Sequence, residues 1–286
     1  MSLDIIQKEI LMPQTYYELI WLFFIYAFIG WCSEVTYAAL ETGDFVNRGF
    51  LNGPYCPIYG FGITLVIVIL IPLKDNLLIL YFGSVLVTSV IEFITGYVLE
   101  KVFHNKWWDY TDKPFNIMGY VCLKFSLLWG FACTFIVLIL HPIIFKVVEI
   151  FPFIVGLIIL IIIAIIFVID CGITVATILK FNQRLKLLNE IAEKIHHVSD
   201  EIGENIYENV TEALEKTQEA KLGIEVRKIE NKMEMERLKN QYYELMEKKI
   251  LGDNRLMKAF PRMSSKYHNE TLQKFKDYRF KKIKRK

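Results

Sequence analysis

The run FPFIVGLIILIIIAIIFVIDCGITVATIL occupies residues 151–179. An apolar run of this length predicts a transmembrane helix, because roughly 20 consecutive apolar residues cross the hydrocarbon core of a bilayer. The run contains a single charged residue, Asp170. It therefore predicts that the chain is an integral membrane protein.

Four further apolar runs precede this one. They cover about residues 17–40, 57–73, 76–100 and 117–141. The chain is thus predicted to be an all-α, polytopic helical membrane protein with about five transmembrane helices. The run 57–73 is short and begins at Pro57, so a re-entrant or interfacial segment is the alternative there.

The composition changes after residue 180, where apolar sequence gives way to charged sequence. The overall hydrophobic content of 54% therefore averages two different parts. We predict three regions: a transmembrane helical body (1–180), a cytoplasmic amphipathic helix or coiled coil (181–250) and a basic C-terminal tail (251–286).

Apolar residues recur every three or four positions from Leu188 to Ile224. This spacing predicts a long helix with a coiled-coil seam, through which a homo-oligomer could form. An antiparallel helical hairpin with its break near Gly223 is the alternative. The basic end of the tail, KKIKRK, is expected to contact anionic membrane lipids, and no nucleic-acid partner is expected.

Basic residues near the ends of the spans predict the orientation, because they favour the cytoplasmic side. They are Arg48, Lys101, Lys106 and Lys113 in the two polar loops, Lys180, Arg184 and Lys186 after the last span, and Lys8, Lys74 and Lys146 on the opposite side. The N-terminus is therefore expected outside and the C-terminal tail in the cytoplasm.

Charged residues occur inside four of the predicted spans. They are Glu34, Glu92, Lys124 and Asp170. At 1.5 Å per residue, each lies roughly 9–15 Å from the predicted cytoplasmic end of its span. Charge in the hydrocarbon region is costly and is usually functional, so these side chains predict a substrate or ion site. A buried ion-pair network that fixes helix packing is the alternative.

The loop NRGFLNGPYCPIYGFG, residues 47–62, lies between the first two runs. Its glycines and prolines interrupt helices, and irregular backbone beside a membrane is tolerated where protein or a water-filled cavity surrounds it. Transporters use such broken helices to bind ligands. Arg48 and Tyr59 are therefore candidate binding residues.

A second polar loop contains WWDYTDKPFNIMGY, residues 107–120. Trp108, Asp109 and Asn116 could recognise a head group or a soluble ligand, or the aromatic residues could form an interfacial belt. Asn116 is also a suitable N-cap for the next span. The five cysteines have no CxxC spacing, so we expect packing residues and neither a metal site nor a bound cofactor.

Two long segments carry a family resemblance. FIYAFIGWCSEVTYAALETGDFVNRGFLNGPYCPIYGFG holds the motifs GW..E and RGFL.GP..PIYG, and IEFITGYVLEKVFHNKWWDYTDKPFNIMGYVCLKFSLLWG holds E..TG..LE and WWDY...P.N..G. Over about residues 20–135 the chain resembles the bacterial membrane-protein family labelled putative ABC-transporter type IV (CmpB-like), and the later segment LMKAFPRM resembles it as well. The resemblance implies a multi-span permease component of a bacterial plasma membrane and supplies no catalytic residue.

Three function classes follow. The first is a transport component, either ABC permease-like or ion-coupled. Because the chain contains no GxxxxGK[ST] motif, an ABC transporter would need a separate ATPase subunit. The second is a membrane enzyme acting on a lipid-linked substrate at the cytoplasmic face, with Asp109, Glu34 or Glu92 as acid or base. The third is a membrane-anchored scaffold or sensor that signals through the coiled coil.

Overall fold

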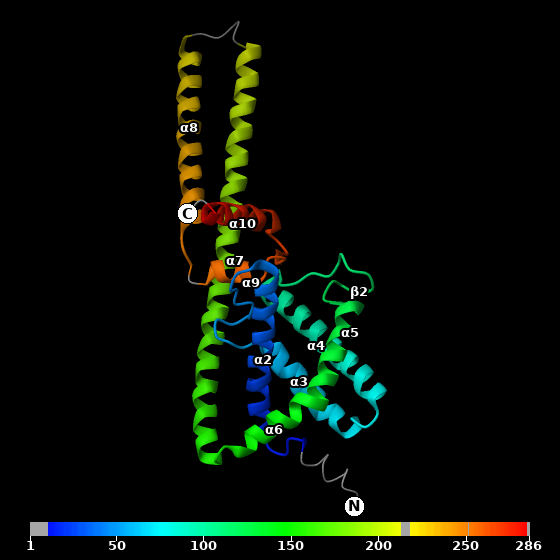
Figure 1. The fold of residues 1–286 in the computed structure, drawn as a ribbon. Helices are drawn as coiled ribbons and strands as arrows, with labels where there is room; N and C mark the ends of the chain where they lie inside the picture. The colour runs from blue at the N-terminus through cyan, green and yellow to red at the C-terminus, as the bar shows by residue number, and fades with distance from the viewer. Residues whose placement is uncertain (1–10, 213–217, 251, 285–286) are drawn as a thin grey trace, which may run out of the picture. The chain divides into compact units, whose positions relative to one another are not determined.

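The computed structural model describes residues 11–212, 218–250 and 252–284. The chain forms two compact units, Met1–Ile178 with Gly252–Lys266 and Leu179–Leu251 with Tyr267–Lys286. This division differs from the predicted one, because residues 252–266 group with the transmembrane body. Figure 1 shows the order of the elements along the chain.

Four of the described helical segments are long and apolar enough to cross a membrane. They are α2 (Tyr16–Thr42), α4 (Leu77–Phe103), the segment Leu123–Ile150 and the apolar part of α7 (Phe153–Glu212). The segment Leu123–Ile150 consists of α5 (Leu123–Phe135), a π-helical turn η2 (Ile136–Leu140) and α6 (His141–Ile150). The prediction of a helical membrane protein is confirmed.

The fifth expected span is a shorter apolar helix. It consists of α3 (Pro57–Leu70) and a 3-10 turn, η1 (Ile71–Leu73). Pro57 occupies its first turn, where a missing N–H costs nothing. The count of five full-length spans is therefore not met by the described helices.

Local signals explain where the long helices begin and end. Thr15 caps α2 in a capping box with Glu18, which satisfies two backbone N–H groups. Gly43 ends α2 with a φ of 74°, a left-handed conformation that glycine adopts without strain. Asn76 caps α4 through two backbone N–H groups.

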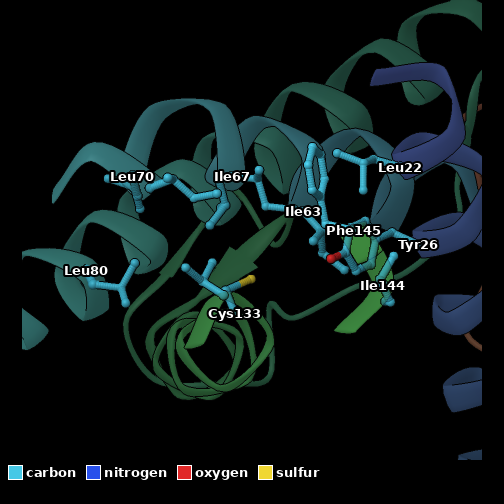
Figure 2. Close-up of a cluster of buried hydrophobic side chains, with 12 residues drawn as sticks. Leu22, Tyr26, Ile63, Ile67, Leu70, Leu80, Cys133, Ile144 and Phe145 are labelled. Carbon is cyan, nitrogen blue, oxygen red and sulfur yellow. The ribbon is translucent and has the colours of Figure 1, made fainter. Parts of the chain in front are cut away.

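A hydrophobic core joins α2, α3, α4, α5 and α6 of the first unit (Figure 2). Its buried members include Leu22 and Tyr26 of α2, Ile63, Ile67 and Leu70 of α3, Leu80 of α4, Cys133 of α5, and Ile144 and Phe145 of α6. Helix α3 thus packs within the protein along much of its length, although it is short.

Two small sheets organise the loops. β2 (Asn116–Ile117) pairs with β3 (Val121–Cys122), and α5 follows with Cys122 as its N-cap. The prediction that Asn116 caps this span was therefore wrong, because the hairpin moves the start of the helix to Leu123. β1 (Asn105–Lys106) pairs with β4 (Ser264–Ser265), which follows α9 (Asp253–Ala259).

The second unit contains the C-terminal part of α7, α8 (Gln218–Glu247) and α10 (Asn269–Lys284). Figure 1 shows α8 running back alongside α7. Val198 of α7 and Leu238 of α8 are both buried and line one surface pocket. This arrangement is that of the hairpin alternative, but Gly223 lies inside α8, so the break predicted there is wrong.

Some sequence predictions fall on residues that the structure does not describe. They concern Lys8, residues 213–217 of the predicted coiled-coil stripe, and the last two residues of the basic end.

Candidate functional site

Glu34 of α2 is the centre of a polar group that also contains Arg48 of the following loop and Tyr59 in the first turn of α3. Arg48 Nε lies 3.2 Å from Glu34 Oε2, and the Tyr59 hydroxyl donates a hydrogen bond of 2.6 Å to Glu34 Oε1. Both carboxylate oxygens are therefore engaged. About a quarter of each of the Glu34 and Arg48 side chains is exposed, at 25% and 26%, so solvent reaches the ion pair.

Arg48 makes two further contacts. Its Nη1 lies 3.5 Å from Glu41 Oε2, and its guanidinium carbon lies 5.3 Å from the centre of the Tyr37 ring. Arg48 thus pairs with two carboxylates, Glu34 and Glu41, and makes a cation–π contact with the Tyr37 ring.

Tyr59 is held in place by close helix packing. A Cβ added at Gly30 of α2 would overlap the Tyr59 ring, so glycine is what lets this ring approach α2. The ring also makes an edge contact with Trp129 of α5, with centroids 5.4 Å apart.

Glu92 lies on α4 and is only 9% exposed. Its Oε1 accepts a long hydrogen bond of 3.4 Å from the Tyr110 hydroxyl. Its Oε2 is buried and has no hydrogen-bond partner among the described residues. Such an oxygen is expensive, because a buried polar atom that loses its water partners costs about 1–3 kcal/mol, and more when charged.

Tyr110 connects the two carboxyl groups electrostatically. Burial raises the pKa of Tyr110 well above its ordinary value, and the charges of Glu92 and Glu34 raise it further. The ring stacks on Phe125 at the start of α5, with centroids 4.9 Å apart. Tyr110 therefore contacts Glu92 directly, and Glu34 acts on it through its charge.

Asp170 binds the loop between α2 and α3 rather than a cation. It is 8% exposed and accepts hydrogen bonds of 2.7 Å from the Asn52 side-chain amide and 2.7 Å from the Gly53 backbone N–H. The Asn52 backbone N–H adds a bond of 3.2 Å. Asp170 thus anchors the loop that carries Arg48.

Lys124 does not join this group in the way that its predicted depth implied. It is the second residue of α5 and is exposed. Because the helix begins at Leu123 and not near residue 117, Lys124 lies at the end of the span. Lys124 is thereby removed from the expected set of four charges, and the carboxylates Glu34, Glu92 and Asp170 remain as candidates.

The loop between α4 and α5 uses its polar groups internally. Asp109 Oδ1 lies 3.0 Å from Lys106 Nζ and accepts a bond of 3.0 Å from the Thr111 N–H. Burial would raise the pKa of Asp109, but these bonds lower it below its ordinary value. A Cβ at Gly119 would come within 2.5 Å of both partners, so this pair requires glycine beneath it.

The other two predicted residues of this loop have similar contacts. The Trp108 indole N–H donates to Tyr120 O at 2.9 Å, and the Asn116 amide donates to Lys113 O at 2.8 Å. These contacts of Trp108, Asp109 and Asn116 therefore stabilise the loop. Among the described residues, no group of three His, Cys, Asp or Glu side chains could hold a metal ion.

The sequence does not indicate the roles of Tyr110, which contacts Glu92, and of Arg255, which holds the loop that carries Arg48. In the sequence Tyr110 is one of several aromatic residues in the run 107–120, and its separation from Phe125 and Glu92 gives no simple pattern. Arg255 of α9 donates hydrogen bonds of 2.7 Å to Gly49 O and 3.0 Å to Phe50 O. The only signal for Arg255 was its position beside the segment LMKAFPRM.

Comparison with known proteins gives one family. A family model described as Putative ABC-transporter type IV matches residues 21–175, more than half of the chain. The match includes Glu34, Arg48, Glu92, Tyr110 and Asp170. No solved structure matches the chain.

Proposed function

The chain belongs to the Putative ABC-transporter type IV family, and on that premise we propose that it is a transport component with a charged binding site in the membrane body. The site consists of Glu34, Arg48, Tyr59, Glu92 and Tyr110 and is called here the Glu34–Glu92 site. It takes a cation: a proton, a monovalent metal ion or a cationic group of a substrate.

The observation that carries this proposal is the buried Oε2 of Glu92, which has no hydrogen-bond partner in the part of the chain that the structure describes. Glu34 is already paired with Arg48 and Tyr59, as a purely structural ion pair would be. Within residues 11–212, 218–250 and 252–284, the hydrogen bond to the Glu92 carboxyl is the long one from Tyr110. A buried carboxyl without a cation is expensive in a membrane and is typical of ion pathways, so an exchangeable cation is the occupant that its chemistry favours.

Two energy sources fit this site. In an ABC transporter, a separate ATPase chain would drive the motion, since the chain contains no GxxxxGK[ST] motif. In an ion-coupled carrier, Glu92 itself would carry the coupling ion. In both cases the loop that holds Arg48 faces the cytoplasm of a bacterial cell, as the basic residues of the loops favour.

The test is cation binding by the full-length protein. Its melting temperature is measured in detergent with Na⁺ or K⁺ against a bulky organic cation, and again at lower pH. A ligand at 100 times its Kd stabilises the native state by about 2.7 kcal/mol. We expect stabilisation by one of these cations in the wild type and its loss in Glu92→Gln.

Glu149→Gln is the matched control, because Glu149 is an exposed carboxylate on α6. This variant should keep the cation dependence. Flux of the stabilising ion into proteoliposomes under an imposed gradient then measures transport. The proposal fails if the wild type responds to no cation, or if Glu92→Gln responds as the wild type does.

A further inference from the structure

Arg255 holds the loop that carries Arg48. The guanidinium donates to two successive carbonyls, Gly49 O at 2.7 Å and Phe50 O at 3.0 Å. These carbonyls follow Arg48 directly in the chain. Arg255 therefore binds the residue next to Arg48, the cation that pairs with Glu34.

Asp170 holds the same loop through its N–H donors, whereas Arg255 holds it through its carbonyl acceptors. It accepts from the N–H of Gly53 and the amide of Asn52, whereas Arg255 donates to the carbonyls of Gly49 and Phe50. A short stretch, residues 49–53, is thus fixed by a cation at its start and an anion at its end. The loop needs both, because neither charge satisfies both kinds of backbone group.

The segment that carries Arg255 also contacts the second polar loop. β4 pairs with β1, with Lys106 opposite Ser264. Phe260 packs against Trp107 with centroids 5.1 Å apart, and Trp107 packs against Phe50 at 5.0 Å. Residues 252–266 therefore join the two loops that supply Arg48 and Tyr110 to the Glu34–Glu92 site.

Arginine suits this position because its planar group offers several N–H donors in a fixed fork. A lysine has one ammonium group on a flexible stem and would hold the two carbonyls less rigidly. The segment is also continuous at both ends with the second unit, since Leu251 and Tyr267 belong to that unit. A change in the second unit can therefore reach the segment through the chain itself.

We propose that residues 252–266 form a latch on the Glu34–Glu92 site, with Arg255 as its positioning residue. When the latch is closed, Arg48 is fixed against Glu34; when Arg255 releases the loop, Arg48 leaves Glu34 and the site opens. The regulatory part of this inference rests on the proposed function. The part that concerns the fixing of the loop by the hydrogen bonds of Arg255 is independent of that function.

Cys56 provides a native reporter of the latch. It lies at the end of the loop, is 5% exposed, and its backbone N–H donates to Ala27 O at 2.9 Å. Burial raises the pKa of its thiol to about 12, the charge of Glu34 adds to this rise, and the charge of Arg255 opposes it. Loss of the Arg255 charge alone would therefore slow labelling, so faster labelling reports exposure of the thiol. A buried thiol that stays protonated reacts slowly with a maleimide.

The experiment is pulsed N-ethylmaleimide labelling of the full-length protein, with the modification of each cysteine measured by mass spectrometry. We expect Arg255→Gln to raise the labelling rate of Cys56 by about 10- to 100-fold, which corresponds to about 1.4–2.8 kcal/mol. Arg255→Lys should give a smaller increase. Cys133 lies in the membrane core, and its labelling should not change.

Lys258→Gln is the matched control, because Lys258 lies on the same helix and is exposed. It should label as the wild type does. The latch is refuted if Cys56 stays protected in Arg255→Gln. It is also refuted if Cys56 and Cys133 become reactive together in both Arg255 variants, because Arg255 would then support only the fold as a whole.

A second comparison separates this inference from the proposed function. Glu92→Gln should leave the labelling of Cys56 unchanged, because among the described residues Glu92 is hydrogen-bonded to Tyr110 and not to residues 252–266. Arg255→Lys, which keeps the charge, should weaken the cation-dependent stabilisation only in part. Faster labelling without any cation response would retain the latch and overturn its regulatory role.

Discussion

Replacing Asp170 with asparagine should destabilise the protein by about 3 kcal/mol. The carboxylate accepts two short bonds of 2.7 Å, from the Asn52 side chain and from the Gly53 N–H. The amide of the asparagine variant has one oxygen and one NH₂ group in place of two oxygens. Its NH₂ group therefore faces either the Asn52 side-chain amide or the Gly53 N–H, and that donor loses its acceptor. Losing one bond to a charged group costs about 1.5–3 kcal/mol, and weakening the other to a neutral bond adds about 1 kcal/mol.

The assay is thermal unfolding in detergent, followed by tryptophan fluorescence. For domains of this size, 1 kcal/mol corresponds to about 2–4 °C, so the expected decrease in melting temperature is on the order of 6–12 °C. Asp44→Asn is the control, because it makes the same change at an exposed position in the same loop. Surface substitutions usually change stability by less than about 0.5 kcal/mol.

One outcome would refute the reasoning. If Asp170→Asn melts within about 2 °C of the Asp44→Asn control, the bonds to Asn52 and Gly53 do not hold the loop. The role of Asp170 as an anchor would then have to be replaced by a role in the binding site.

Three further predictions concern packing, pH and orientation. Gly30→Ala should destabilise the protein by about 1–3 kcal/mol through overpacking against Tyr59, whereas Gly62→Ala, which meets open space, should not; equal melting temperatures would contradict this. Burial lowers the pKa of Lys276 from 10.5 to about 8, so the unfolded chain binds more protons than the folded one between these values and stability should rise with pH across this window. Lys276→Met should remove that rise in chemical denaturation experiments, and an unchanged pH profile would count against it. Protease added to intact cells should remove a tag at the N-terminus and spare one at the C-terminus; the reverse pattern would overturn the orientation.

Hydropathy was sufficient to predict the helical membrane protein, because span length depends only on local composition. The glycines and prolines of residues 47–62 were sufficient to predict an irregular loop between α2 and α3. Arg48 of this loop pairs with Glu34. The start of α5 could not be predicted, because the β2–β3 hairpin depends on pairing between Asn116 and Cys122. That pairing moved Lys124 to the end of the helix.

Long-range contacts were the other limit. Arg255 and Gly49 are 206 residues apart, and nothing in either local sequence indicates the other. The bond between Tyr110 and Glu92 is similar, since it depends on how a polar loop folds back on α4. Composition can identify a polar loop, but it cannot show which of its groups are already used within the loop.

The return of residues 252–266 to the membrane body has a consequence for biosynthesis. Ribosomes add about 5–20 residues per second, so Arg255 is made about 10–40 s after Gly49, to which it binds across 206 positions. During that time the carbonyls of Gly49 and Phe50 lack their native donor. The loop between α2 and α3 therefore obtains its native contacts only after the 206 residues that separate Gly49 from Arg255 have been made, and a chain truncated before Arg255 would enter the membrane with these two carbonyls still without Arg255.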